Sequence, residues 1–356
     1  MAKKLRKKYI SSGPMPVPKW ENVLVVGAGI AGLEAASQLL SLGYKVTLID
    51  KASYAGGHVA SWHKLFPDRT DASSVITGLL SSIAGATLLL STEILSVHRL
   101  GEGFAVVLSG GETLYFKAIL LATGFSLFPA EKKEEYGYGV YNQVITNSDL
   151  EQWFNEGNDP RINDRKISSV GFVHCVGSRD IKAGNPQCSK VCCITAVKQA
   201  IEIKQHFPDA EVWCFYMDLR LFGKKYEDFY ISAQKDYGIH FIRGRVSEVS
   251  EAIDGEVIVK AEDTLNGRPV KIKLSLLVLM AGIISRNDIQ PLAEDLSVMM
   301  DSDGFLLSRD NITGITRSQR PGIFYAGTCT GPKTIPESLA EARSAAIDIH
   351  NYLRGL

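Results

Sequence analysis

The stretch NVLVVGAGIAG, residues 22–32, decides the fold that this sequence predicts. A short β-branched run ends in the pattern GxGxxG, and an Ala-rich amphipathic segment follows from Leu33 to about Leu42. A second apolar run, 45–49, ends in Asp50. Strand, glycine-rich turn, helix and strand in this order indicate a parallel α/β unit that binds a dinucleotide. The pyrophosphate would lie at the helix N-terminus, where unpaired N–H groups favour negative charge.

The three glycines of the turn have separate expected roles. Gly27 permits the tight turn, Gly29 lets the backbone approach the pyrophosphate, and Gly32 lets the helix pack closely on the strand. Asp50 lies 18 residues beyond Gly32, where a carboxylate can bind the ribose hydroxyls. An ordinary surface acid at the end of a strand is the alternative interpretation of Asp50.

Further glycine-terminated segments lie far along the chain. Gly56-Gly57 follows the acid, and the strands AILLATGF (118–125) and GIFYAG (322–327) both reach a glycine. A long helix is predicted from Thr334-Ile-Pro to about Tyr352, with Pro336 in its first turn. This arrangement resembles the flavoproteins of the thioredoxin reductase type. The resemblance implies an α/β fold with two Rossmann-like dinucleotide-binding domains, bound FAD, and a C-terminal helix whose N-terminus faces the flavin.

The same resemblance divides the chain and names the cofactor contacts. Residues 1–19 are a basic tail, 20–130 and 285–356 form a discontinuous FAD domain, 131–165 connect, and 166–284 form the second domain. The residues expected to contact FAD are Gly27, Gly29, Ile30, Ala31, Gly32, Asp50, Lys51, Gly57, His58, Ile94, Ala122, Thr123, Gly124, Gly327, Thr328, Ile335 and Pro336.

The second domain lacks the glycine pattern of a nicotinamide site. Its strand, 167–173, leads into the turn HCVGSRD, 174–180, which has one glycine where three are expected. A pyrophosphate could not approach this backbone in the usual way. We therefore do not expect NAD(P)H to bind there.

Four of the six cysteines cluster at this point instead. Cys175, Cys188, Cys192 and Cys193 form a C-x12-C-x3-C-C array, and the segment from Ile194 to Ile203 is predicted to be a helix. Thiols at a helix N-terminus ionise more easily, and thiolates bind metals. Four thiolates match a 4Fe-4S cluster or one zinc, and adjacent ligands favour the larger cluster. A redox disulfide between Cys188 and Cys193, a C-x4-C pair, remains the alternative.

The other two cysteines have different expected roles. Cys214 lies in an aromatic strand, 212–216, and is predicted to be a core residue. Cys329 follows Gly327 in the turn over FAD, and we do not assign it a catalytic role.

Several motifs together resemble the A subunits of the heterodisulfide reductases. They are HCVGSRD (174–180), CSKVCC (188–193), YGYG (136–139), DLR (218–220), FIRGR (241–245), TCTGPK (328–333) and IPES (335–338). The resemblance implies that the four-cysteine array holds a 4Fe-4S cluster near FAD. The family uses further cysteines after a segment like FPDRTD, 66–71, and here the next positions are Ala-Ser-Ser-Val. His58 stands where the family has arginine; it could tune the flavin or be structural.

The resemblance also implies an electron-transfer role. A short chain of this kind is most like the flavin subunit of the sulfur-oxidising heterodisulfide reductase-like complex, with quinone-interacting oxidoreductases of sulfate reducers as the alternative. A stand-alone NAD(P)H-dependent disulfide reductase using Cys188 and Cys193 is the third interpretation. We expect partner subunits, a homodimeric core and a thiol/disulfide or sulfur-carrier substrate. Arg179, Asp218 and Arg220 are either neighbours of the cluster or surface ion pairs.

Composition excludes several other classes of protein. Of 356 residues, 45% are hydrophobic and 22% charged, which is typical of a globular protein. The formal net charge is zero, so we expect no nucleic-acid partner. Six basic residues and no acid in the first 19 leave 33 basic against 39 acidic residues in the remainder, a net charge of −6. Without an export signal before them, clustered cysteines favour a cytoplasmic protein.

One long uncharged segment raises the question of a membrane span. Residues 72–92 contain no charge, but ten of these 21 residues are Ser, Thr or Gly. We therefore predict no transmembrane segment, but a buried helix followed by a strand at 86–90.

Overall fold

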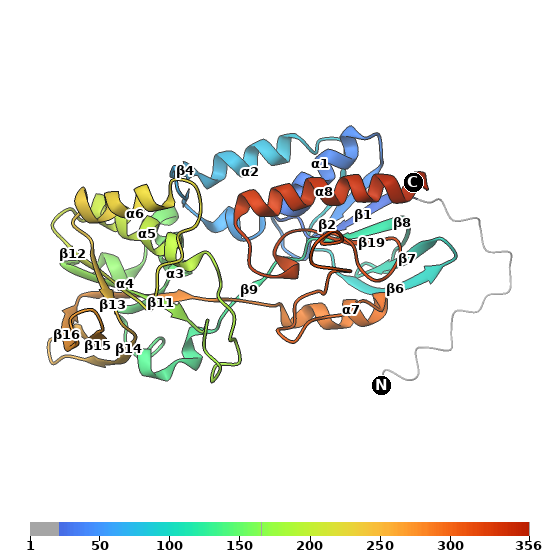
Figure 1. Cartoon of the computed structure of the whole chain (residues 1–356). Coiled ribbons are helices and arrows are strands. Elements are labelled where there is room, and N and C mark those ends of the chain that lie inside the picture. The colour runs from blue at the N-terminus through green and yellow to red at the C-terminus, as the bar shows by residue number, and fades with distance from the viewer. Residues whose placement is uncertain (1–20, 165, 356) are drawn as a thin grey trace.

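The computed structural model describes residues 21–164 and 166–355, which form two lobes (Figure 1). Strands from residues 21–121 and 323–325 form the sheet of the first lobe, and strands from residues 144–281 form the sheets of the second lobe. Two short antiparallel strands, β9 (Ser126–Leu127) and β18 (Ile283–Ile284), run between the lobes. The basic tail expected at 1–19 lies outside the described residues.

The first lobe is built on a mixed sheet with a parallel centre. Its strand order is β5-β2-β1-β8-β7-β6, and β19 pairs with the second half of β8. The long β8 therefore belongs to both the parallel centre and an antiparallel meander with β7 and β6. The strands are β1 (Glu21–Val26), β2 (Val46–Ile49), β5 (Thr87–Leu89), β6 (Ile94–Leu100), β7 (Gly103–Leu108), β8 (Thr113–Leu121) and β19 (Ile323–Tyr325).

Helices from distant parts of the sequence cover this sheet. The helices α1 (Ile30–Ser41) and α8 (Ile335–Arg354) lie side by side on one face (Figure 1). Small residues of α8 such as Ala342 and Ala346 are fully buried there, so the two helices approach closely. The short helix α7 (Gln290–Leu296) packs on the opposite face. The continuous apolar runs of β1 and β2 are buried on both faces, as a parallel centre requires.

The second lobe has a fully parallel five-stranded sheet. Its order is β10-β17-β11-β12-β13, and helices cover one face while a three-stranded antiparallel sheet covers the other. The strands of the parallel sheet are β10 (Val144–Thr146), β11 (Ser169–Val176), β12 (Glu211–Tyr216), β13 (His240–Arg243) and β17 (Leu276–Ala281). The helices are α3 (Asn147–Glu156), α4 (Pro160–Asn163), α5 (Cys192–His206) and α6 (Tyr226–Lys235), and the small sheet contains β14 (Val246–Glu251), β15 (Val257–Asp263) and β16 (Arg268–Leu274).

The segment expected to connect the domains, 131–165, takes part in the second lobe. Its strand β10 pairs with β17, and Leu150 and Trp153 of α3 enter the core of that lobe. Thr146 begins α3 with a capping box, its side chain accepting from the Asp149 N–H. A strand of three residues such as β10 is too short to show an alternating pattern in the sequence. Residues 131–165 therefore gave no sign that they belong to the second lobe.

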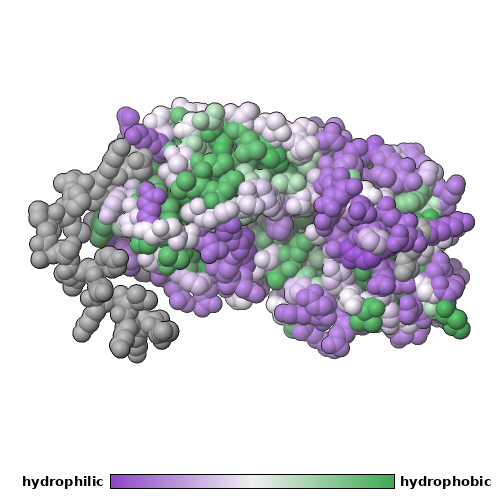
Figure 2. All heavy atoms as spheres, turned by 180° about the vertical axis from the view of Figure 1, so that it is seen from behind, coloured by the Kyte–Doolittle hydropathy of each residue, from purple (hydrophilic) through white to green (hydrophobic). Residues whose placement is uncertain are grey.

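The uncharged segment 72–92 folds as expected, but its helix is not buried. The helix α2 (Ala72–Ser81) and the strand β5 are present, yet only Ala72 and Ile76 of α2 are buried. Serine and threonine fill most of its outer face, so exposing that face costs little. Figure 2 shows a broad hydrophobic area on the rear face of the first lobe. Among the described residues, no helix is both long and apolar enough to cross a membrane.

Candidate functional site

The glycine turn forms as the spacing predicts. Gly27 has a φ of 107°, and a β-carbon there would lie 2.3 Å from the carbonyl oxygen of Ala122. A β-carbon on Gly32 would lie 1.8 Å from the carbonyl oxygen of Gly27, so α1 packs directly on the turn. The first turn of α1 has no side-chain cap and no acidic residue. Its N–H groups are therefore free to bind a phosphate.

Asp50 supports the turn as well as lining the site. Its Oδ2 accepts a hydrogen bond from the Ala28 N–H at 2.7 Å, and its Oδ1 accepts from Ala52 at 2.9 Å. These bonds fix the carboxylate at the mouth of the turn. Each oxygen keeps further acceptor capacity for a ribose hydroxyl.

Three adjoining pockets form one continuous trough. The first and second share Asp50, Lys51 and Thr123, and the second and third share His58, Phe125 and other residues. The trough thus runs past the glycine turn and ends between the lobes at Cys192. An extended dinucleotide has this shape, with an adenosine end, a pyrophosphate and a second ring system.

The trough contains most of the predicted cofactor contacts. Ile94 lines the first pocket. The second pocket is lined by Gly27, Gly29, Ile30, Ala31, Asp50, Lys51, Gly57, His58, Ala122, Thr123, Gly124, Gly327, Thr328 and Ile335. Gly32 instead contacts the turn, and Pro336 lies in the first turn of α8. The glycine turn, Ala-Thr-Gly and the 327–335 segment thus come together although they are far apart in sequence.

Sequence reasoning missed several residues of the same trough. Trp62, Phe125 and Lys333 line both the second and the third pocket. Arg286 lines the first and second, and its guanidinium donates to Asp288 at 2.6 Å. The available signal for Phe125 was its place directly after Ala-Thr-Gly, and the signal for Arg286 was its place two residues after the apolar run that ends at Ile284. Lys51 and Arg286 together hold the pKa of Asp288 well below its usual range, with Arg286 the larger cause.

His58 faces the second half of the trough. Its Nε2 donates to the carbonyl oxygen of Phe125 at 2.9 Å, and the two rings stack with centroids 4.2 Å apart. The ring is accessible from the open trough, but the surrounding walls still lower its pKa, and nearby Arg286 lowers it further. His58 is therefore a neutral imidazole at neutral pH.

A bulge in β11 brings the first cysteine toward the other thiols. The pairing of β11 with β17 shifts register between Val173 and Val176, and Cys175 has a φ of 59°. Such a bulge redirects side chains that an uninterrupted strand would place on alternate faces. Helix α5 begins at Cys192, so the adjacent Cys192 and Cys193 lie in its first turn as predicted.

Three of the four predicted cluster thiols lie together. The Cys192 thiol is within hydrogen-bonding reach of Cys175 and Cys193, and all three residues are buried. Hydrogen bonding from Cys192 lowers the pKa of Cys175 and of Cys193, and it raises the pKa of Cys192 itself. Cys175 and Cys193 therefore favour the thiolate, which is the form that binds metals, whereas Cys192 favours the neutral thiol.

Cys188 stands somewhat apart from these three. It is half-buried, and its Sγ accepts from the Lys190 N–H at 3.3 Å. Within residues 21–164 and 166–355, no three His, Cys, Asp or Glu side chains are already spaced as metal ligands. The donor chemistry of the four thiols fits an iron–sulfur cluster.

The buried His174 lies beside the thiols and has no nitrogen or oxygen hydrogen-bond partner among the described residues. Its side chain is only 6% exposed. Its neighbours are the sulfur atoms of Cys193 and Cys214; burial opposes a charge on the ring, but these sulfurs raise its pKa. Buried polar groups are almost always satisfied, so an orphan imidazole beside thiols fits a sulfur-rich group.

Arg179 and Asp218 lie at the edge of the thiol group. The Arg179 guanidinium donates to both oxygens of Asp218, at 2.7 and 2.9 Å. The Cys193 thiol donates to the Asp218 carbonyl oxygen at 3.8 Å, and the hydrogen bond with Asp218 is the largest cause of the raised pKa of Arg179. The Arg220 side chain reaches Asp218 from an exposed position, while its backbone hydrogen-bonds Cys193. Arg179, Asp218 and the Arg220 backbone thus border the thiols, and the Arg220 side chain forms a surface ion pair.

The place of a second nucleotide is filled by protein. A β-carbon on Gly177 would lie 2.0 Å from the ring of Phe128, which covers the turn. Asn185 donates to the Gly177 carbonyl oxygen at 2.7 Å and closes the loop from the other side. This packing supports the expectation that no pyrophosphate approaches here.

The remaining cysteines behave as core residues. Cys214 is fully buried in β12. The Cys329 thiol donates to the carbonyl oxygens of Leu121 and Ala326, and burial raises its pKa to about 12. A neutral, hydrogen-bonded thiol is a poor nucleophile.

Comparison with known proteins agrees with this geometry. Residues 25–77 match the family described as NAD(P)-binding Rossmann-like domain. The iron-sulfur A subunit of the CoB–CoM heterodisulfide reductase of Methanocaldococcus jannaschii is 32% identical over 92% of this chain and 63% of its own length. One of the corresponding A subunits of Methanopyrus kandleri is 42% identical over 64% of this chain and 36% of its own length. The chain is a relative of the heterodisulfide reductase A subunits.

The chain spans less than two thirds of the length of each of these relatives. Solved structures extend the likeness to the whole fold. Thioredoxin reductases from T. acidophilum and Lactococcus lactis superimpose with TM-scores of 0.65 and 0.67, at 19% and 16% identity. Each match covers 94% of this chain and at least 98% of the other. The predicted thioredoxin reductase-like fold is therefore confirmed.

An ion pair joins the cysteine loop to the trough. The Lys190 Nζ lies 2.6 Å from Glu337 Oε1, and Glu337 belongs to the first turn of α8. We expect Lys190→Met to loosen the loop by about 0.5 kcal/mol, because both side chains are partly exposed. In the cofactor-free chain, alkylation of Cys188 by iodoacetamide, followed by mass spectrometry, should become about twofold faster. Lys182→Met is the control, and an unchanged rate for Lys190→Met would contradict this role.

Proposed function

We propose that this chain binds FAD and one 4Fe-4S cluster and transfers electrons between them as an oxidoreductase subunit of a heterodisulfide reductase-like complex. The substrate class is a thiol/disulfide couple or sulfur carrier presented by partner subunits. The sulfur-oxidising complex is the favoured setting, because positions 72–75 lack the accessory cysteines of the longer relatives. We propose a homodimeric core and a cytoplasmic location.

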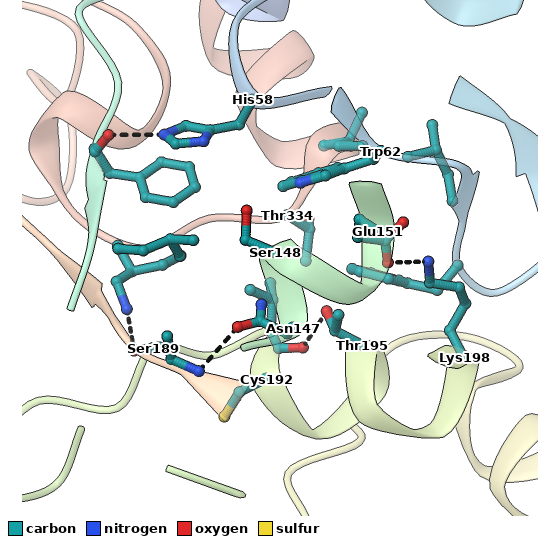
Figure 3. A pocket seen from close by; sticks show the side chains of 18 of the residues that line it. His58, Trp62, Asn147, Ser148, Glu151, Ser189, Cys192, Thr195, Lys198 and Thr334 are labelled. Carbon is teal, nitrogen blue, oxygen red and sulfur yellow. Dashed lines mark hydrogen bonds and ion pairs between the residues drawn. The ribbon is translucent and has the colours of Figure 1, made fainter. Parts of the chain in front are cut away.

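The observation that carries this proposal is where the trough ends. The third pocket is lined by His58 and Ile335 from the first lobe and by Cys192 from the second. A dinucleotide in the trough would therefore end beside Cys192 (Figure 3), whose thiol is within hydrogen-bonding reach of Cys175 and Cys193. Direct electron transfer between two bound cofactors requires that their sites be adjacent, and the trough and the cysteines meet this requirement.

The residues of the first lobe would bind and orient FAD. The free N–H groups of α1 receive the pyrophosphate, and Asp50 receives a ribose. The neutral His58, fixed by Phe125, faces the far end without adding a charge. FAD, once bound, supplies a centre that accepts either one or two electrons. The capped N-terminus of α8 closes this end of the trough.

The residues of the second lobe would hold the cluster. Cys175, Cys192 and Cys193 are already in contact, and Cys188 completes the set from its loop. His174 supplies an N–H donor toward sulfur, which stabilises added negative charge. Phe128 over Gly177 argues against a nicotinamide as the direct reductant in this lobe.

Anaerobic analysis of the purified chain tests the proposal. We expect one FAD and about four iron and four sulfide per chain, with flavin bands and a broad shoulder near ~400 nm. NAD(P)H alone should not bleach the flavin. Less than one iron per chain would contradict the cluster, and rapid bleaching by NAD(P)H with no iron would favour a stand-alone disulfide reductase.

A further inference from the structure

Four titratable side chains meet at the junction of the two lobes. They are His63 from the first lobe, Glu151 on α3, and Lys198 and Glu202 on α5. The side chains of Glu151, Lys198 and Glu202 are 4%, 2% and 1% exposed, whereas His63 is 27% exposed. We call this set the junction cluster. Neither cofactor proposed above uses it.

The members of the junction cluster form an unbroken chain of contacts. His63 Nδ1 lies 2.8 Å from Glu202 Oε1, and Glu202 Oε2 lies 2.9 Å from Lys198 Nζ. Lys198 Nζ in turn donates to Glu151 Oε1, while Glu151 Oε2 accepts from the His63 backbone N–H at 2.9 Å. The chain therefore runs from a solvent-accessible imidazole to a buried carboxylate.

The far end of the chain opens on the trough. Glu151 and Lys198 line the third pocket together with His58, Thr334 and Cys192 (Figure 3). Trp62 and Phe125 supply much of the remaining wall, so this end is largely apolar. The junction cluster thus joins the protein surface to the space between the expected flavin ring and the thiols.

Charge counting leaves the junction cluster one proton short of neutrality. Two carboxylates and one ammonium carry one uncompensated negative charge, and burying such a charge costs several kcal/mol. One further proton between His63 Nδ1 and Glu202 Oε1, which lie 2.8 Å apart, would balance the set. Gln199 is fully buried beside Glu151 and donates to it at 2.7 Å, yet its own Oε1 has no donor among the described residues. An acceptor left open at this point fits a water molecule within the path.

We propose that His63, Glu202, Lys198 and Glu151 form a proton path from solvent to the flavin end of the trough. The proposal rests on the function proposed above, because it presumes bound FAD. Iron–sulfur donors transfer electrons without protons, whereas a flavin that takes up two electrons also takes up a proton at N5. Apolar side chains such as Trp62 and Phe125 line much of this pocket, whereas the junction cluster offers a continuous set of polar contacts to it.

The transfer balances in atoms and charge. Two iron–sulfur electrons, each from oxidation of one iron(II) to iron(III), and one proton from the path convert oxidised flavin to its anionic two-electron-reduced form. Lys198 first donates a proton to the ionised Glu151, and Glu151 then releases that proton to the pocket. Glu202 and His63 then reprotonate Lys198, and water reprotonates His63. The other cations of the pocket are Lys64 and Lys333, and Lys333 is held by the Gly327 carbonyl oxygen at 3.0 Å.

Stopped-flow measurement on the flavin-loaded full chain tests the path. Reduction by the methyl viologen radical, a one-electron donor, is followed by flavin absorbance and by proton uptake with a pH indicator in weak buffer. We expect Glu202→Gln to slow proton uptake about tenfold or more. His63→Gln changes a half-exposed residue that tolerates substitution, and its loss should be rescued by added imidazole, which a purely structural role would not allow.

A second readout uses the flavin-free chain. Infrared spectra of the unaltered chain should contain a buried protonated-carboxyl band that Glu202→Gln removes. The control is Glu156→Gln on α3, the helix that carries Glu151, where the exposed Glu156 contacts Gln152. Uptake within about twofold of the unaltered chain in both Glu202→Gln and His63→Gln, at equal flavin content, would overturn the path. A chain that binds no flavin would instead overturn the function proposed above.

Discussion

Replacing Cys192 by serine should strip the iron from this chain while leaving FAD in place. Cys192 is the thiol in contact with both Cys175 and Cys193, and it is 5% exposed. A serine hydroxyl is a far weaker ligand for iron than a thiolate. We expect the iron content to fall from about four to less than one per chain, with loss of the shoulder near ~400 nm. The flavin bands should remain, because the glycine turn lies in the other lobe.

Cys214→Ser provides the matched control for this experiment. Cys214 is buried in the same core and borders the same His174, but it is outside the four-cysteine array. Its hydroxyl should cost about 1–3 kcal/mol of stability and leave the iron content unchanged. Full iron content in a folded Cys192→Ser chain, checked by circular dichroism, would refute the assignment of the array.

Replacing Gly32 by alanine should abolish FAD binding. Its β-carbon would lie 1.8 Å from the carbonyl oxygen of Gly27, so either the turn or α1 has to move. Overpacking of this kind costs about 1–3 kcal/mol, and the displaced N–H groups no longer meet the pyrophosphate. We expect at least a hundredfold weaker FAD binding in a flavin fluorescence titration, together with a lower thermal midpoint.

Gly78→Ala controls for the general effect of adding a methyl group to a helix. Gly78 lies in α2, and nothing stands within 4 Å of a β-carbon built there. Alanine should stabilise the chain by about 0.5–1 kcal/mol and leave FAD binding unchanged. Equal FAD affinity in the Gly32 and Gly78 variants would show that the glycine turn does not carry the cofactor.

The sequence predicts those parts of the fold in which a short sequence pattern is compatible with only one backbone conformation. β1, the glycine turn and α1 follow from NVLVVGAGIAG, because the required φ of Gly27 and the contact of Gly32 are local. The start of α5 at Cys192 is predictable for the same reason. Ile94 and Asp50 could be placed through the resemblance, since both lie beside the first pocket of a known trough.

The rest depends on contacts between distant segments. Trp62, Phe125 and Arg286 are far apart in sequence, and only the folding of the first lobe brings them to one pocket. The junction cluster was missed for the same reason, since Glu151 and Lys198 are 47 residues apart on different helices. The exposure of α2 was mispredicted because lack of charge was taken for burial, although its outer face is mostly hydroxyl side chains.

The discontinuity of the first lobe sets an order on assembly. The segment from β19 to the start of α8 supplies Gly327, Thr328 and Ile335 of the trough, and these residues leave the ribosome after the whole second lobe. Domains usually fold as units from the N-terminal side during synthesis. The thiol lobe is thus translated in full while the flavin lobe still lacks its last strand and helix. Of the two cofactor sites proposed above, the cysteine site is therefore translated in full first, and the FAD site is complete only after β19 and α8 have been made.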